Sequence, residues 1–382
     1  MTNSGAIAIA HKEFLDHLRS RKFLLILGIL LVIAVIGVIN GISDYNASLA
    51  AYNNLEITAS HDWGSTLTED LYQKVKPSVL LVFYQMSMLF TMIGGILGIA
   101  LGFDLVTKEK ESRSLKILLA HPVYRDEVIN GKALGGIGAI LLALGITMTA
   151  SLAVMLILGI VPDISELLPL LVFCAVTFLF IFSYFAIALL MSTLCEESGR
   201  SLVYTLVIFV IFGSFIPVVV SSPLVMDQII GPAPELPKLI AGPTGTRADS
   251  TDQQEEAARI QEQNRDAWDM YDHQVQDYGK KQMMVAELQY LFSPQKNYDK
   301  ITTFLTNPAM TSNMLYPIMG KGWGSLNEAS EDISVSVMYE KLADFDFSEI
   351  LAMVFENIVA LLVFPCVFFG LAYVAFMRMD IR

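Results

Sequence analysis

Six long apolar runs constrain this chain more than any other feature. They cover residues 23–42, 79–103, 133–161, 168–194, 202–225 and 351–376. A helix needs about 20 apolar residues to cross a hydrocarbon layer roughly 30 Å thick. Because that layer offers no water to backbone N–H and C=O groups, each run is expected to be helical. The sequence therefore predicts an all-α polytopic membrane protein with six transmembrane helices.

The segment before the first run has a pattern of its own. Residues 1–22 place Ile7, Phe14, Leu15 and Leu18 at helical spacing, with basic residues on the other face. Such a helix is expected to lie at the membrane interface, with its apolar face toward the acyl chains. The first run could be a secretory signal, but it is longer than the roughly 7 to 15 residues of a signal core. We therefore expect a retained helix.

Charge divides the segments between the runs into two groups. Segments 1–22, 104–132, 195–201 and 377–382 hold 13 Lys and Arg against 10 Asp and Glu. Segments 43–78, 162–167 and 226–350 hold 12 Lys and Arg against 27 Asp and Glu. Because Lys and Arg near helix ends stay on the cytoplasmic side, both termini are predicted to be cytoplasmic in a multi-pass protein of the cell membrane.

The runs also predict the domain layout. We expect an N-terminal amphipathic interface helix over 1–22, transmembrane helices 1–5 over 23–225 with an outer loop at 43–78, an extracytoplasmic domain over 226–350, and helix 6 with a short tail over 351–382. The outer domain begins with a Pro/Gly-rich connector and continues with helical periodicity from about Asp252 to Phe292. This domain is therefore expected to be largely helical. It could pack on the helix ends, on a second copy or on a substrate.

The sequence holds no recognisable catalytic or metal-binding motif. It lacks G-x-x-x-x-G-K-[ST], H-E-x-x-H and G-x-S-x-G, its five histidines are scattered, and its three cysteines lie in or beside the apolar runs. We expect no catalytic residues, no metal and no cofactor in this chain. A net charge of -13 also argues against nucleic acid as a partner.

Two features inside the runs are candidates for function. Glu356 and Asn357 are polar positions in the sixth run, where an ionisable group by default marks a pathway or a paired interior site. Glu356 could instead reach water at the outer end, and Asn357 could join helices. In the second run, Gly94, Gly98 and Gly102 form a stripe suited to close helix or subunit packing.

The loop at 104–132, between the second and third runs, is rich in charge. After Ser114, it places Leu115, Leu118 and Leu119 on one face of a short helix. Pro122 ends that helix, because proline disfavours helical geometry at the preceding residue. A compact helix held at both ends by transmembrane helices is suited to receiving force from a soluble partner.

These residues resemble a known family. The run Glu109-x-Glu111-x-x-Ser114-Leu115-x-x-Leu118-Leu119-x-x-Pro122-Val123-x-Arg125-x-x-Val128-x-x-Gly131-Lys132 resembles the corresponding loop of ABC-2 type permeases, the membrane subunits of ABC exporters. The segments "HKEFLDHLRSRKF" and "LFSPQKNYDKITTFL" are similar to that family as well.

The resemblance implies partners and residue roles. The loop helix would be a coupling helix seated on a separate ABC ATPase, present in two copies, which binds ATP and Mg. The chain would pair with a second permease copy, as a homodimer, or with a paralogue. Contacts to the ATPase would come from Glu109, Glu111, Arg113, Leu115, Leu118 and Leu119, while Pro122, Arg125, Gly131 and Lys132 would shape the return to the membrane. The rival interpretation is a membrane-anchored sensor or scaffold whose acidic outer domain binds a ligand or partner.

Overall fold

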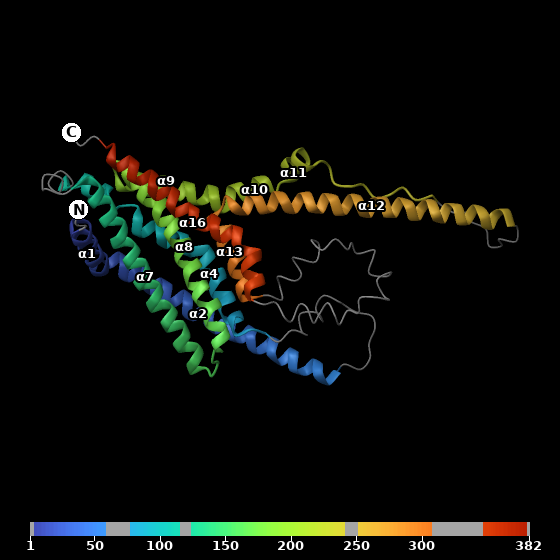
Figure 1. Cartoon of the computed structure of the whole chain (residues 1–382), viewed down its shortest axis with the longest axis horizontal. Helices are drawn as coiled ribbons and strands as arrows, with labels where there is room; N and C mark the ends of the chain where they lie inside the picture. The colour runs from blue at the N-terminus through green and yellow to red at the C-terminus, as the bar shows by residue number, and fades with distance from the viewer. Residues whose placement is uncertain (1–3, 59–76, 115–123, 241–250, 308–346, 380–382) are drawn as a thin grey trace. The chain divides into compact units, whose positions relative to one another are not determined.

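The computed structural model describes residues 4–58, 77–114, 124–240, 251–307 and 347–379. Every regular element in these ranges is helical, and Figure 1 shows the path of the chain. Before residue 198 the elements are α1 (Ser4–Arg19), α2 (Arg21–Thr58), η1 (Val79–Leu81), α4 (Val82–Gly102), α5 (Thr107–Glu111), α7 (Arg125–Ile157) and α8 (Ile164–Leu194). They continue with α9 (Ser198–Val210), η2 (Ile211–Phe215), α10 (Ile216–Val220), α11 (Pro223–Ile230), α12 (Thr251–Leu291), α13 (Pro294–Thr306) and α16 (Phe347–Met377). The predicted all-α class is confirmed.

Six helical segments are long and apolar enough to cross a membrane. They are Arg21–Asn53, Val79–Glu111, Arg125–Ile157, Ile164–Leu194, Ser198–Val220 and Phe347–Met377. The six predicted crossings are therefore confirmed, although several helices extend past the apolar runs. The helical backbone continues into polar residues at these ends, which hydropathy alone does not register.

The chain forms two compact units. Unit 1 contains Met1–Ile216, Tyr290–Thr311 and Tyr339–Arg382, and unit 2 contains Pro217–Gln289 and Ser312–Met338. The segment 226–350, expected as a single outer domain, is thus shared between the two. Its helix α13 belongs to unit 1 because Tyr298, Ile301, Phe304 and Leu305 are buried against the core of that unit.

Helix α8 lies at the centre of unit 1. Its side chains from Tyr184 to Leu189 are all buried, and the helix packs against α4 and α16. Phe180 of α8 stacks on Tyr298 of α13, with ring centroids 4.5 Å apart. In contrast, α9 and α16 leave long apolar side chains exposed along one side. These two helices therefore supply much of the apolar surface of unit 1.

The fifth and sixth crossings each contain a proline, and the helix responds differently to the two. The fifth crossing contains a π-helical turn, η2, which ends two residues before Pro217. Proline cannot donate a backbone hydrogen bond, and wide turns of this kind accompany such interruptions. In contrast, α16 remains one helix through Pro365.

Unit 2 is built around the helix α12. Residues 231–240 form no helix, as the prolines there predict. Their end is fixed to α12 by Asn264, whose Oδ1 accepts from Ile240 N at 2.9 Å and whose Nδ2 donates to Ile240 O at 3.0 Å. Trp268 and Tyr271 of α12 meet edge to face, and much of the described surface of this helix is exposed.

Candidate functional site: a charged junction of helices

Charged residues join the helices α1, α5, α7, α8 and α9 at one place, which we call the junction. The close packing of α1 on α7 forms its first part. Three glycines of α7 face α1. A Cβ atom added at Gly131 would lie 2.7 Å from Ile9 Cβ, and one added at Gly135 would lie 2.6 Å from Glu13 Cβ. Gly138 faces the ring of Phe14. Contacts advance in the same direction on both helices, so α1 runs parallel to α7. The absence of side chains on this stripe brings the two backbones close together.

This packing involves part of the apolar face predicted for residues 1–22. Phe14 and Leu18 of that face pack against the core of unit 1, and Ile9 also packs there. Ile7 is exposed. The position of α1 at a membrane interface stays a prediction.

Lys132 lies at the centre of the junction. Its ammonium group donates to Glu13 Oε1 at 2.9 Å and to Glu109 Oε1 at 2.7 Å, while only 1% of its side chain is exposed. The two carboxylates come from α1 and α5, so one buried cation links three helices. Removing one partner of a buried ion pair typically costs about 3 to 5 kcal/mol, since the remaining charges stay buried without compensation.

Further polar groups surround the triad of Lys132, Glu13 and Glu109. Lys22, at the start of α2, forms an ion pair with Asp104, in the turn after α4, and its ammonium group also lies over the ring of Phe103. His17 of α1 is half-buried, and its buried Nε2 atom has no hydrogen-bond partner among the described residues. Burial lowers the pKa of His17, against the opposing pull of Glu13 and Asp104. His17 is therefore held mainly in its neutral form.

Helix α5 also binds the end of α8 and the start of α9. Lys110 Nζ donates to the carbonyl oxygens of Thr193 and Cys195, at 2.6 and 2.8 Å. These carbonyls end a helix, where a cation is favoured. Glu111 Oε1 accepts a hydrogen bond from Ser198 N at the N-terminus of α9, where an anion is favoured. These two charges on α5 thus match the helix ends that they meet.

Buried hydroxyl groups support this contact. Ser192 Oγ accepts from the backbone N–H groups of Val106 and Thr107, at 2.9 and 3.1 Å. Ser198 Oγ lies 3.0 Å from Thr107 Oγ1. The residues that open the loop are consequently fixed on the ends of two helices.

Arg125 connects the other end of the loop to the last helix. Its Nη1 donates to Met379 O at 2.9 Å and to Met377 O at 3.3 Å, where α16 ends. At the same end of unit 1, Gly5 lies next to the carboxylate of Glu127. The first and last described residues therefore lie at the same end as the loop, as Figure 1 shows.

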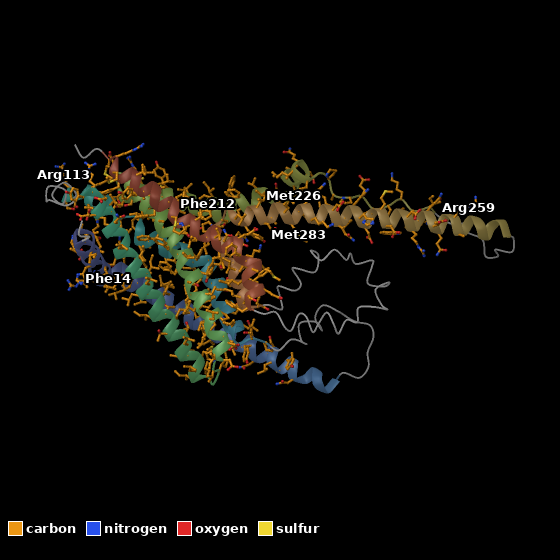
Figure 2. All side chains as sticks on the ribbon, viewed as in Figure 1. Phe14, Arg113, Phe212, Met226, Arg259 and Met283 are labelled. Carbon is orange, nitrogen blue, oxygen red and sulfur yellow. The ribbon has the colours of Figure 1, made fainter. Side chains whose placement is uncertain are left out.

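The predicted coupling residues divide into three groups. Glu109, Glu111 and Arg125 contact other helices of this chain, so their charges serve the junction. Arg113 is exposed and adopts a positive φ of 57°; Figure 2 places it at the end of the unit. The remaining predicted positions, Leu115, Leu118, Leu119 and Pro122, lie outside the described residues.

The glycine stripe of α4 lies inside unit 1. Gly98 and Gly102 face the backbone oxygens of Ile181 and Phe185 in α8, and Gly94 faces the ring of Phe180. The close approach that the spacing predicted is therefore made to a helix of the same chain.

The two polar residues predicted in the sixth crossing, Glu356 and Asn357, differ in burial. Asn357 is buried and donates from Nδ2 to Asn297 Oδ1 of α13 at 2.7 Å. Glu356 is exposed on this chain. Asn357 thus joins two helices, and only Glu356 remains available to an external partner.

Several junction residues were not assigned a role from the sequence. The sequence offered one usable sign, the small-residue spacing of Gly131, Gly135 and Gly138, which places three glycines along one side of a helix. Glu13 and Lys110 gave no such sign, because their partners are far away in sequence. Glu13 is separated from Lys132 by 119 positions.

Six apolar spans and a charged junction at one end define a multi-pass membrane protein of the transporter class. A family model, described as ABC-2 family transporter protein, matches residues 7–381. The chain therefore belongs to this family, and it is a membrane permease component of an ABC transporter. Membership implies association with an ABC ATPase and dimerisation in the membrane in general. A search of curated proteins returned no match.

Proposed function

We propose that this chain is the transmembrane subunit of an ATP-driven exporter, energised through loop 104–132. A separate ATPase, present in two copies, binds ATP and Mg and drives the movement. A second copy of this chain completes the transport path as a homodimer. Both termini and the loop would lie in the cytoplasm, and the segment 226–350 would be extracytoplasmic.

The junction is the observation that carries this proposal. In a separate-subunit transporter, force from ATP binding must enter the membrane subunit at a place connected to its transmembrane helices. The segment 104–111 meets that requirement. It contacts Lys132 of α7 through Glu109, the end of α8 through Lys110, and α9 through Glu111. Lys132 also binds Glu13 and so joins α1 to this contact.

Buried ionic contacts are suited to moving helices together. The triad around Lys132 costs several kcal/mol to break, so a displacement of α5 is expected to carry α1 and α7 with it. The adjoining residues 115–123 would then receive the movement from the ATPase. Arg113 is exposed beside them and is the described residue best placed to contact that partner.

The exposed helix surfaces support the proposed homodimer. On α9, Val203, Val207 and Val210 are each at least half exposed and lie on one face. Phe212 of η2 meets Phe364 and Phe368 of α16 edge to face. A second copy packed on α9 would cover the valine face, and the remaining apolar surface would meet lipid.

Co-purification with the ATPase subunit encoded nearest to this gene tests the proposal. Wild type is expected to retain the ATPase in mild detergent, and replacing Leu115, Leu118 and Leu119 together by alanine is expected to reduce its recovery at least tenfold. Arg113→Glu is expected to weaken recovery to a smaller extent. Lys280→Glu, an exposed charge change on α12, is the matched control and should have no effect.

The same experiment separates the two functional classes. Recovery of the ATPase that is unaffected by the leucine and Arg113 changes would contradict coupling through the loop. A chain that performs its cellular role after deletion of the ATPase gene would instead be a sensor or scaffold.

A further inference from the structure

An apolar pocket lies beside the junction, between α1, α7, α8 and α16. Its volume is about 300 Å³, at the lower end of the roughly 300 to 1,000 Å³ of small-ligand pockets. It is lined by Ala6, Ile7, Asn130, Ala133, Leu134, Ile137, Phe182 and Phe369. None of these residues takes part in the ion pairs of the junction. The pocket has room for part of a chain-like ligand.

Its position along the helices places it at the edge of the hydrocarbon layer. Asn130, Leu134 and Ile137 follow one face of α7, about 8, 14 and 18 Å from Arg125 at 1.5 Å per residue. The 33-residue helix is about 50 Å long against a layer of roughly 30 Å, so about 10 Å extends past each side. Asn130 therefore lies near the headgroup boundary, and the rest of the pocket lies within the acyl region.

The polarity of the pocket follows this depth. Asn130 is its only polar lining residue, and the amide makes no hydrogen bond within the described ranges. The Asn130 amide can therefore donate a hydrogen bond to a neutral ester oxygen of a ligand.

We propose that this pocket binds an acyl chain of a bilayer phospholipid, with Asn130 donating to an ester oxygen of its glycerol backbone. The chain would lie along α7 over Leu134 and Ile137, between the side chains that α1 and α16 contribute. It would thereby fill the space beside the α1–α7 contact and hold α1 in place.

Photo-crosslinking in vesicles tests this site. The full chain is placed in phosphatidylcholine vesicles that contain phosphatidylcholine with a diazirine midway along one acyl chain. After illumination, labelling is measured on the peptides that carry Phe182 and Phe369. Leu134→Trp fills the pocket and is expected to reduce this labelling at least threefold.

The matched control is Leu141→Trp. Leu141 lies seven residues further along α7 and is exposed to the same 50% as Leu134, but it does not line the pocket. It should leave labelling at Phe182 and Phe369 unchanged. Asn130→Leu, which removes the amide without filling the pocket, should reduce labelling about threefold and provides a second variant if Leu134→Trp disturbs folding.

Two outcomes would overturn the proposal. Equal labelling in the Leu134→Trp, Asn130→Leu and Leu141→Trp proteins would show ordinary contact with surrounding lipid. Labelling that Leu134→Trp reduces but Asn130→Leu leaves at the wild-type level would show that the amide does not hold the ester oxygen.

Discussion

Charged side chains act differently at the junction and along α12. At the junction, Lys132 is buried and contacts carboxylates from two other helices. On α12, Lys280 and Asp277 are 3.7 Å apart within one helix, with 60% and 71% of their side chains exposed. Exposed pairs of this kind contribute roughly 0 to 1 kcal/mol, whereas breaking a buried pair costs several. Charge density alone therefore does not indicate what a charged segment does.

The largest expected effect is that of Lys132→Met. The substitution keeps much of the side-chain volume but leaves the half-buried carboxylates of Glu13 and Glu109 without a cation. We expect a loss of about 3 to 5 kcal/mol of stability, measured as a large fall in the melting temperature of the purified protein. Lys280→Met on α12 is the matched control, with a change below about 0.5 kcal/mol. Similar melting temperatures for the two variants would remove the distinction between the regions.

The packing beneath the triad gives the second prediction. Gly135→Leu would force a side chain into Glu13 Cβ and Ala10 O of α1, at a cost of about 1 to 3 kcal/mol. Gly145, on the same helix, has no atom within 4 Å of its Cβ position, so Gly145→Leu should be well tolerated. Melting temperatures and proteolysis within α1 would detect the difference. Equal sensitivity at both glycines would contradict the α1–α7 contact.

The sequence predicted the six crossings because the hydrocarbon layer permits few alternatives to long apolar helices. It did not show which loop charges are buried, since Glu109 in an ion pair and Glu109 on a solvated surface have the same sequence. Partners such as Glu13 and Lys132 become neighbours only after α1 packs on α7. The spacing of Gly94, Gly98 and Gly102 indicated close packing, but the sequence could not distinguish a contact within the chain from one between subunits.

A smaller effect is expected at the polar pair of α16. Asn357→Leu would leave the buried Asn297 without its 2.7 Å hydrogen bond. Hydrogen bonds between membrane helices average about 0.6 kcal/mol and reach about 1.7, so we expect a loss of about 1 kcal/mol. The neighbouring change Glu356→Gln is the control, because Glu356 is exposed on this chain. A larger loss of stability for Glu356→Gln than for Asn357→Leu would contradict the assignment of Asn357 as the residue that joins the two helices.

The smallest effect concerns pH. Burial lowers the pKa of His17 below its ordinary value of 6.5, so the unfolded chain binds a proton more readily than the folded one. Stability is then complete above pH 6.5 and falls as the pH decreases from there toward the lowered pKa. Melting temperatures between pH 7.5 and 5 should fall more for wild type than for His17→Gln. If the melting temperatures of wild type and His17→Gln fell in parallel as the pH decreased, the pKa of His17 would not be lowered in the folded protein.

A mutant cycle around Lys132 tests the central claim most directly. The melting temperatures of wild type, Lys132→Met, Glu13→Gln/Glu109→Gln and the triple variant are compared under one condition. If the three charges form one buried junction, the triple variant will be more stable than Lys132→Met alone, because no carboxylate is left without a cation. If the losses of the single and double variants simply add in the triple variant, the charges act independently and the junction does not exist as described.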